Sequence, residues 1–111
     1  GVRAVMIAIE RIREAARILA DAAHPLKIIL FGSYAHGRPT EESDVDLLVI
    51  ERVLANKLEE MVRLRRLLRP LRIPVDVLVY SEDDVREWGH LPGTTLYWAL
   101  KQGKVLHEAT G

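Results

Sequence analysis

Two neighbouring stretches carry the strongest structural pattern in this chain: Ile28-Ile29-Leu30-Phe31-Gly32-Ser33 and Asp44-Val45-Asp46-Leu47-Leu48-Val49-Ile50. Short apolar runs bounded by turn residues are typical of buried β-strands, so each stretch predicts one strand. The first stretch ends in a Gly-Ser turn, whose backbone N–H groups can hold a phosphate. The second begins with two aspartates one residue apart, which point to the same face of a strand with Cα atoms roughly 6.5–7 Å apart. This spacing suits a shared divalent cation such as Mg²⁺, which favours carboxylate and phosphate oxygens.

The apolar periodicity of the flanking sequence predicts an alternation of helices and strands. We expect helices from Val2 to the His24-Pro25 break, over 54–71 and over 92–102, a capped helix starting at Ser81, and strands over 26–31, 45–50, 75–80 and 104–107. Residues 32–37 are predicted to turn into a short helical segment. The expected fold is α/β, a small mixed sheet of three to four strands flanked by helices, in one domain spanning residues 1–111.

Composition limits the class of protein. The chain has no cysteine, equal numbers of acidic and basic residues, and no apolar run long enough to span a membrane. Charged residues interrupt the N-terminal apolar positions, so no signal peptide is predicted. We therefore expect a soluble cytoplasmic protein, without a membrane partner and without nucleic acid as a direct partner.

A third acidic residue, Asp76, lies inside the apolar run Val75–Val79. A carboxylate in a core strand is costly unless it has a cation or a hydrogen-bonding partner. Three converging acids would repel one another by roughly 3 kcal/mol per pair at about 6 Å and an effective dielectric near 20. No basic residue adjoins these positions along the chain, although Arg38 in the loop is within reach. A divalent metal is the simplest compensation.

Each feature also has a plainer interpretation when it is taken alone. The Gly-Ser turn resembles an ordinary strand–helix turn, and the aspartates could be acids at the edge of a loop. Together with Asp76, however, they favour a nucleotide site, although a retained fold can be inactive. Several other polar and aromatic residues are interpreted as structural: an arginine cluster as a solvated helix face, Tyr97 and Trp98 as core or interface, and His36 as a surface-turn residue. The arginine cluster comprises Arg63, Arg65, Arg66, Arg69 and Arg72.

Gly32-Ser33, Asp44-Val45-Asp46 and Asp76 resemble the motif of the minimal nucleotidyltransferase group in the polymerase-β superfamily. The likeness covers most of the chain, including the ending from Trp98 to Glu108. It implies a polymerase-β-like fold that moves a nucleoside monophosphate from a triphosphate to an acceptor hydroxyl, with release of pyrophosphate.

The resemblance also implies roles for the candidate site residues. Asp44 and Asp46 would bridge two Mg²⁺ ions, and Asp76 would bind the metal on the nucleophile side. Ser33 and the N–H groups near Gly32 would hold the terminal phosphates. From its position in the loop, Arg38 is predicted to neutralise the leaving pyrophosphate.

Small proteins of this group are commonly antitoxins encoded beside a HEPN-domain ribonuclease toxin. The resemblance implies that this chain moves AMP from ATP to a tyrosine of such a toxin. Two alternatives remain: a silent antitoxin that neutralises by binding, and a small-molecule nucleotidyltransferase completed by a separate helical subunit. The modest core is also compatible with a homodimer or a hetero-oligomer.

Overall fold

A four-stranded sheet lies at the centre of the structure, a computed structural model that describes residues 7–110. Its strands are β1 (Lys27–Phe31), β2 (Val45–Glu51), β3 (Val75–Ser81) and β4 (Lys104–Glu108), in the spatial order β3-β2-β1-β4. β1 is antiparallel to both β2 and β4, whereas β2 and β3 are parallel. The sheet is therefore mixed, as predicted, and β3 and β4 are its edges.

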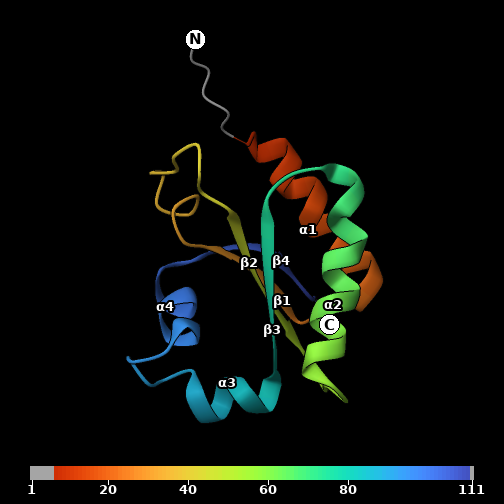
Figure 1. Cartoon of the computed structure of the whole chain (residues 1–111). Helices are drawn as coiled ribbons and strands as arrows, with labels where there is room; N and C mark the ends of the chain where they lie inside the picture. Colours follow the sequence, from red (N-terminus) through yellow and green to blue (C-terminus); the bar gives the residue numbers. More distant parts are fainter. Residues whose placement is uncertain (1–6, 111) are drawn as a thin grey trace.

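Helices cover both faces of this sheet (Figure 1). α1 (Ile9–Ala23) and α2 (Lys57–Leu68) lie on one face, and the 3₁₀ turn η1 (Arg69–Leu71) follows α2. α3 (Glu82–Trp88) and α4 (Thr95–Gln102) lie on the other. The predicted α/β fold, a mixed sheet flanked by helices, is confirmed.

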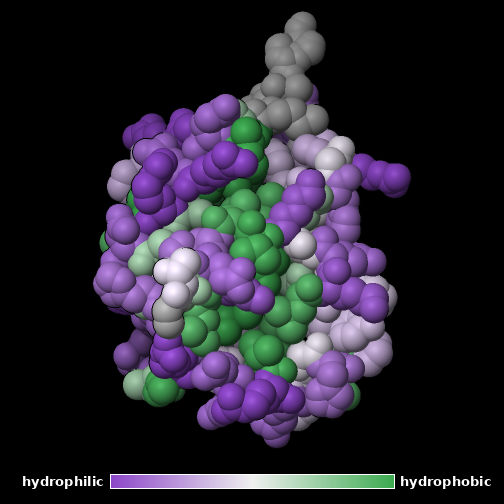
Figure 2. Space-filling view, turned by 180° about the vertical axis from the view of Figure 1, so that it is seen from behind, coloured by the Kyte–Doolittle hydropathy of each residue, from purple (hydrophilic) through white to green (hydrophobic). Residues whose placement is uncertain are grey.

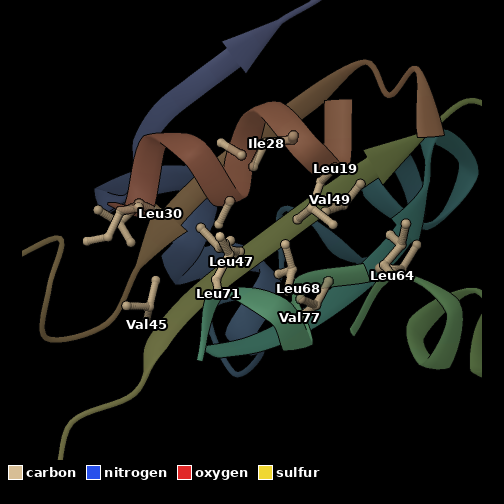
Figure 3. Packing of buried hydrophobic residues seen from close by; sticks show 14 of the residues in the cluster. Leu19, Ile28, Leu30, Val45, Leu47, Val49, Leu64, Leu68, Leu71 and Val77 are labelled. Carbon is tan, nitrogen blue, oxygen red and sulfur yellow. The ribbon is translucent and has the colours of Figure 1, made fainter. Parts of the chain in front are cut away.

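Alternate residues of β1 and β2 pack into two separate cores. Leu47 and Val49 join the larger cluster under α1 and α2, drawn in Figure 3. Leu48 and Ile50 join a smaller cluster with Leu96 of α4. Because successive side chains alternate across a strand, a residue's position along β2 fixes which helical layer it faces.

Two helix starts differ from the prediction because polar caps, not apolar periodicity, set them. The Asn56 side chain accepts the Glu59 N–H at 3.0 Å, so α2 begins at Lys57 and leaves Leu54 outside. Thr94 likewise accepts the Tyr97 N–H at 3.1 Å, so α4 begins at Thr95 instead of at residue 92. The capped start of α3 at Ser81 is confirmed.

The other differences concern the first helix and the turn after β1. α1 begins at Ile9, and the predicted positions Val2, Val5 and Met6 lie outside the described residues. Residues 33–37 form hydrogen-bonded turns and not a helix: the N–H groups of Ala35 and His36 both donate to the Gly32 carbonyl, at 3.0 and 3.2 Å, and the Arg38 N–H donates to the Ser33 carbonyl at 3.0 Å.

Within residues 7–110, no helix has the length and apolar character needed to cross a membrane. Hydrophobic residues nevertheless reach the surface, where Figure 2 shows a hydrophobic band, bordered by hydrophilic side chains, on the side hidden in Figure 1. Val105 of the edge strand β4 is among the exposed hydrophobic residues, at 51% exposure. A contiguous exposed apolar surface often marks a protein interaction site.

Candidate functional site

Gly32 brings the end of β1 close to the acidic strand β2. Its φ of +76° lies in the left-handed region that favours glycine. A Cβ atom at this position would lie 2.3 Å from Oδ2 of Asp46, closer than any real contact allows. The preceding residue, Phe31, pairs with Asp46 across the two strands. Glycine is therefore needed here both for the backbone conformation and for the approach of the Asp46 carboxylate.

The turn after Gly32 leaves backbone donors free. Ser33 and Tyr34 donate no backbone–backbone hydrogen bond within residues 7–110, while the next two N–H groups close on the Gly32 carbonyl. Successive free N–H groups beside a left-handed residue form a concavity that suits anions. Ser33, His36 and Arg38 line a hollow of about 450 Å³. Two residues predicted to contact phosphate, Ser33 and Arg38, thus share one hollow.

Asp46 and Asp76 are direct partners in the parallel pairing of β2 and β3. Register partners point to the same face of a sheet, and this face carries α3 and α4. Burial raises the pKa of the Asp46 carboxyl, and the charges of Asp76 and then Asp44 raise it further. Asp44 is exposed and lies one residue before β2, not on the strand as expected. The three acids therefore interact electrostatically at one end of the sheet.

Asp76 differs from the prediction in having a cationic partner. Nη2 of Arg65, on α2, lies 2.5 Å from Oδ1 of Asp76 and donates to the Val77 carbonyl at 3.0 Å. The Asp76 side chain is 45% exposed because β3 is an edge strand. The sequence predicts a buried carboxylate compensated by a divalent metal, whereas in the structure Asp76 is half-exposed and its cationic partner is Arg65. Arg65 lies on an exposed helix face, as predicted, and in addition forms this ion pair. Sequence reasoning missed this pair because nothing distinguishes Arg65 from its neighbouring arginines.

The paired arginine also bears on metal binding. In the described part of the chain, no three acidic or histidine side chains already form a metal-binding group. The acids are gathered, but Asp76 is turned toward Arg65.

A second cleft, of about 360 Å³, opens on the α4 side of Gly32. Trp98 lines this cleft and is 46% exposed, so of the two predicted alternatives, core or interface, the structure excludes the core. The side chains of Phe31 and His36 contribute to the same wall. An aromatic side chain therefore lies exposed beside the acidic end of the sheet, a placement that helical spacing alone did not indicate.

A turn with backbone N–H donors beside carboxylates on adjacent strands is an arrangement suited to a phosphate compound bound together with a metal ion. The family model described as "Polymerase beta, Nucleotidyltransferase" matches residues 13–110, so the chain belongs to that nucleotidyltransferase family.

Two proteins of Methanocaldococcus jannaschii are similar in sequence. "Putative protein adenylyltransferase MJ0604" is 34% identical over 86 residues, which are 73% of this chain and 77% of that protein. "Putative protein adenylyltransferase MJ1379" is 50% identical over 40 residues, 36% of this chain and 40% of that protein.

Two solved structures share the fold, each at 24% sequence identity. One is a crystal structure of a putative nucleotidyltransferase from Sulfolobus solfataricus, with a TM-score of 0.57 over 89% of this chain and 86% of that chain. The other is described as a toxin–antitoxin with AMP-PNP, with a TM-score of 0.62 over 88% and 74%. The predicted membership of the polymerase-β nucleotidyltransferase superfamily and the predicted fold are confirmed, and the chain is a nucleotidyltransferase.

Proposed function

We propose that this chain transfers AMP from ATP, with Mg²⁺ bound, to a hydroxyl group of a partner protein. The observation that carries the proposal is the register pairing of Asp46 with Asp76 beside the Gly32 turn. Membership of the nucleotidyltransferase family supports the reaction class. The relatives named as protein adenylyltransferases support AMP as the transferred group and a protein as its acceptor.

The donor atoms of the site fit Mg²⁺. Asp44, Asp46 and Asp76 offer hard carboxylate oxygens, which Mg²⁺ favours together with substrate phosphates. Burial raises the pKa of Asp46, and the charges of Asp76 and Asp44 add to the shift; a divalent cation would offset these charges. These three residues would hold the metal, two ions in the complete site. Metal bound there would neutralise phosphate charge and lower the pKa of the acceptor hydroxyl.

In the proposed reaction, the acceptor oxygen attacks the α-phosphorus of ATP. The bond from that phosphorus to the bridging oxygen breaks, and pyrophosphate leaves. Ser33 and the free N–H groups of the turn hold the terminal phosphates, while Arg38 offsets the charge that develops on pyrophosphate. Asp76 accepts the proton of the hydroxyl. In the structure this carboxylate is paired with Arg65, so metal and substrate have to compete with that ion pair.

We propose that the acceptor is a tyrosine of a HEPN-domain toxin, and that the chain acts as its antitoxin in the cytoplasm. A structure with this fold described as a toxin–antitoxin with AMP-PNP supports the search for such a partner. The exposed hydrophobic band in Figure 2 supports contact with a second protein chain.

The direct test is incubation with ATP, Mg²⁺ and the protein encoded by the neighbouring reading frame, which the proposal expects to be a HEPN-domain protein, followed by intact mass measurement. We expect AMP-sized increments on a tyrosine of the partner, and none with the variant Asp44→Asn/Asp46→Asn. If that variant still neutralises the toxin, the chain acts by binding alone. If a small-molecule hydroxyl is modified and the toxin is not, the protein acceptor is wrong.

A further inference from the structure

The cleft beside Gly32 is open, and its largest exposed side chain is aromatic. Trp98 of α4 lines it at 46% exposure. The Tyr97 ring packs edge-to-face against the indole with 5.0 Å between ring centroids. The Lys101 ammonium lies over the Tyr97 ring, 5.7 Å from its centroid. The indole is therefore supported by its neighbours while part of its surface stays accessible.

The cleft adjoins the acidic centre. Gly32 forms part of its wall, and a Cβ at Gly32 would lie 2.3 Å from Oδ2 of Asp46. His36 lines both this cleft and the hollow formed with Ser33 and Arg38. Two concavities, one basic and one aromatic, therefore share His36 in their lining.

The polar groups of the cleft suit a flat, hydrogen-bonding ligand. The Thr94 hydroxyl is already used within the protein: it caps α4 by accepting from the Tyr97 N–H and donates to the Leu91 carbonyl. Gln102 also lines the cleft and is exposed, and its side-chain amide offers both a donor and an acceptor. A nucleobase combines an aromatic face with donors and acceptors at its edge, and base stacking on indole or phenol rings is a common binding mode.

We propose that Trp98 is the stacking platform for the purine base of the nucleoside triphosphate, with Gln102 at the edge of the base. The inference rests on the proposed function, because it places the triphosphate in the neighbouring hollow lined by Ser33, His36 and Arg38. The base and the phosphates then occupy neighbouring concavities that share His36, and Asp46 lies against Gly32 in the lining of the base cleft. Trp98 binds the nucleotide and takes no part in the bond-making step.

The chain offers a matched control in its other tryptophan. Trp88 of α3 is 47% exposed and does not line this cleft. In Trp88→Phe, Trp98 is the single source of indole fluorescence, and in Trp98→Phe, Trp88 is. We expect ATP with Mg²⁺ to quench the first variant and to leave the second unchanged. Inorganic triphosphate with Mg²⁺ should quench neither.

Affinity measurements separate the base from the phosphates. Trp98→Ala should weaken ATP binding about 5- to 100-fold, and leave the binding of inorganic triphosphate unchanged. Trp88→Ala should change neither affinity. Thermal unfolding of each variant identifies any loss of fold, and the two phenylalanine variants test the same point without truncating the side chain.

Three results would overturn the proposal in distinguishable ways. Equal ATP affinity in wild type and Trp98→Ala removes the base platform but leaves the proposed function intact. Unchanged ATP affinity with slower transfer to the protein acceptor would assign the cleft to the acceptor instead. If neither ATP nor inorganic triphosphate binds wild type, the proposed function itself fails.

Discussion

Gly32 and Gly37 form a matched pair for testing the contact between the turn and Asp46. Both have a left-handed backbone, with φ of +76° and +73°, so alanine costs about 1–2 kcal/mol in stability at either site. Only at Gly32 does a Cβ meet the Asp46 carboxylate; at Gly37 no atom lies within 4 Å. We therefore expect Gly32→Ala to lower activity about 100-fold by displacing Asp46, and Gly37→Ala to retain most of it. Steady-state transfer rates compare the two variants, and equal losses would contradict this role of Gly32.

Asp46 should show a conflict between stability and function. Its carboxylate is partly buried and faces the charges of Asp76 and Asp44. Asp46→Asn removes one of these like charges, so we expect it to stabilise the metal-free protein by about 1 kcal/mol, roughly 4 °C in Tm, and to abolish transfer. Asp44→Asn is the control: Asp44 is exposed, so its stability gain should be smaller. Thermal unfolding without divalent metal measures both, and a less stable Asp46→Asn would show that the carboxylate is favourably bonded in the folded state.

The end of β2 and the first turn of α2 contact each other through the carboxyl groups of Glu51 and Glu60. Burial raises the pKa of Glu51 to about 8, and the neighbouring Glu60 contributes to the shift. Arg63 binds both Glu60 oxygens at 2.8 Å, which lowers the pKa of Glu60. Among the described side chains, Glu51 Oε2 is a buried atom without a hydrogen-bond partner, so the charged form of this carboxyl is poorly compensated. β2 and α2 are therefore linked by a carboxyl–carboxylate–guanidinium group.

This linkage predicts how stability depends on pH. A raised pKa means that the folded state binds the proton more tightly, so the contribution of Glu51 is full below about pH 4.5 and is lost as pH rises through 8. The lowered pKa of Glu60 has the opposite effect on stability: its contribution is present above pH 4.5 and is lost as the pH falls below that value. Glu51→Gln should therefore match wild type near pH 5 and exceed it by about 1 kcal/mol at pH 9, after allowing for solvent screening. Urea unfolding at both pH values measures this difference, and the exposed neighbour Glu59 supplies the control Glu59→Gln, which should show no pH-dependent difference.

The same elements show which parts of the fold the sequence can predict. The strands follow from apolar runs, because the sheet is buried on both sides. The shared face of Asp46 and Asp76 can be predicted only conditionally, since it also requires that β2 and β3 be neighbours in this register. Helix starts depend instead on single cap residues such as Asn56, which periodicity does not register. The Arg65–Asp76 ion pair depends on how α2 packs over the edge of β3, and the exposure of Trp98 depends on what lies above α4. Such long-range contacts have no local pattern in one sequence.

The two helical layers of the molecule differ in the size of the hydrophobic core that each one covers. α1 and α2 cover the larger core, whereas α3 and α4 cover only a small cluster around Leu96, and the candidate site lies on this thinner side. Regions with fewer buried apolar contacts open more readily. We expect backbone amides of α4 to exchange with solvent faster than those of β1 and β2. Added ATP with Mg²⁺ should slow the α4 amides selectively, because the proposed base cleft joins α4 to the Gly32 turn.

Two core substitutions test this difference between the layers. Leu96 and Leu64 are both almost fully buried, one in each core. Alanine at either position should cost about 2–5 kcal/mol if the surrounding layer stays folded. Leu96→Ala should speed exchange mainly in α3 and α4, because this layer can open while the sheet remains covered by α1 and α2. Leu64→Ala should speed exchange throughout the described chain, because residues from all four strands pack in the larger core. Hydrogen exchange resolved by element measures both, and uniform acceleration by Leu96→Ala would show that the two layers unfold as one unit.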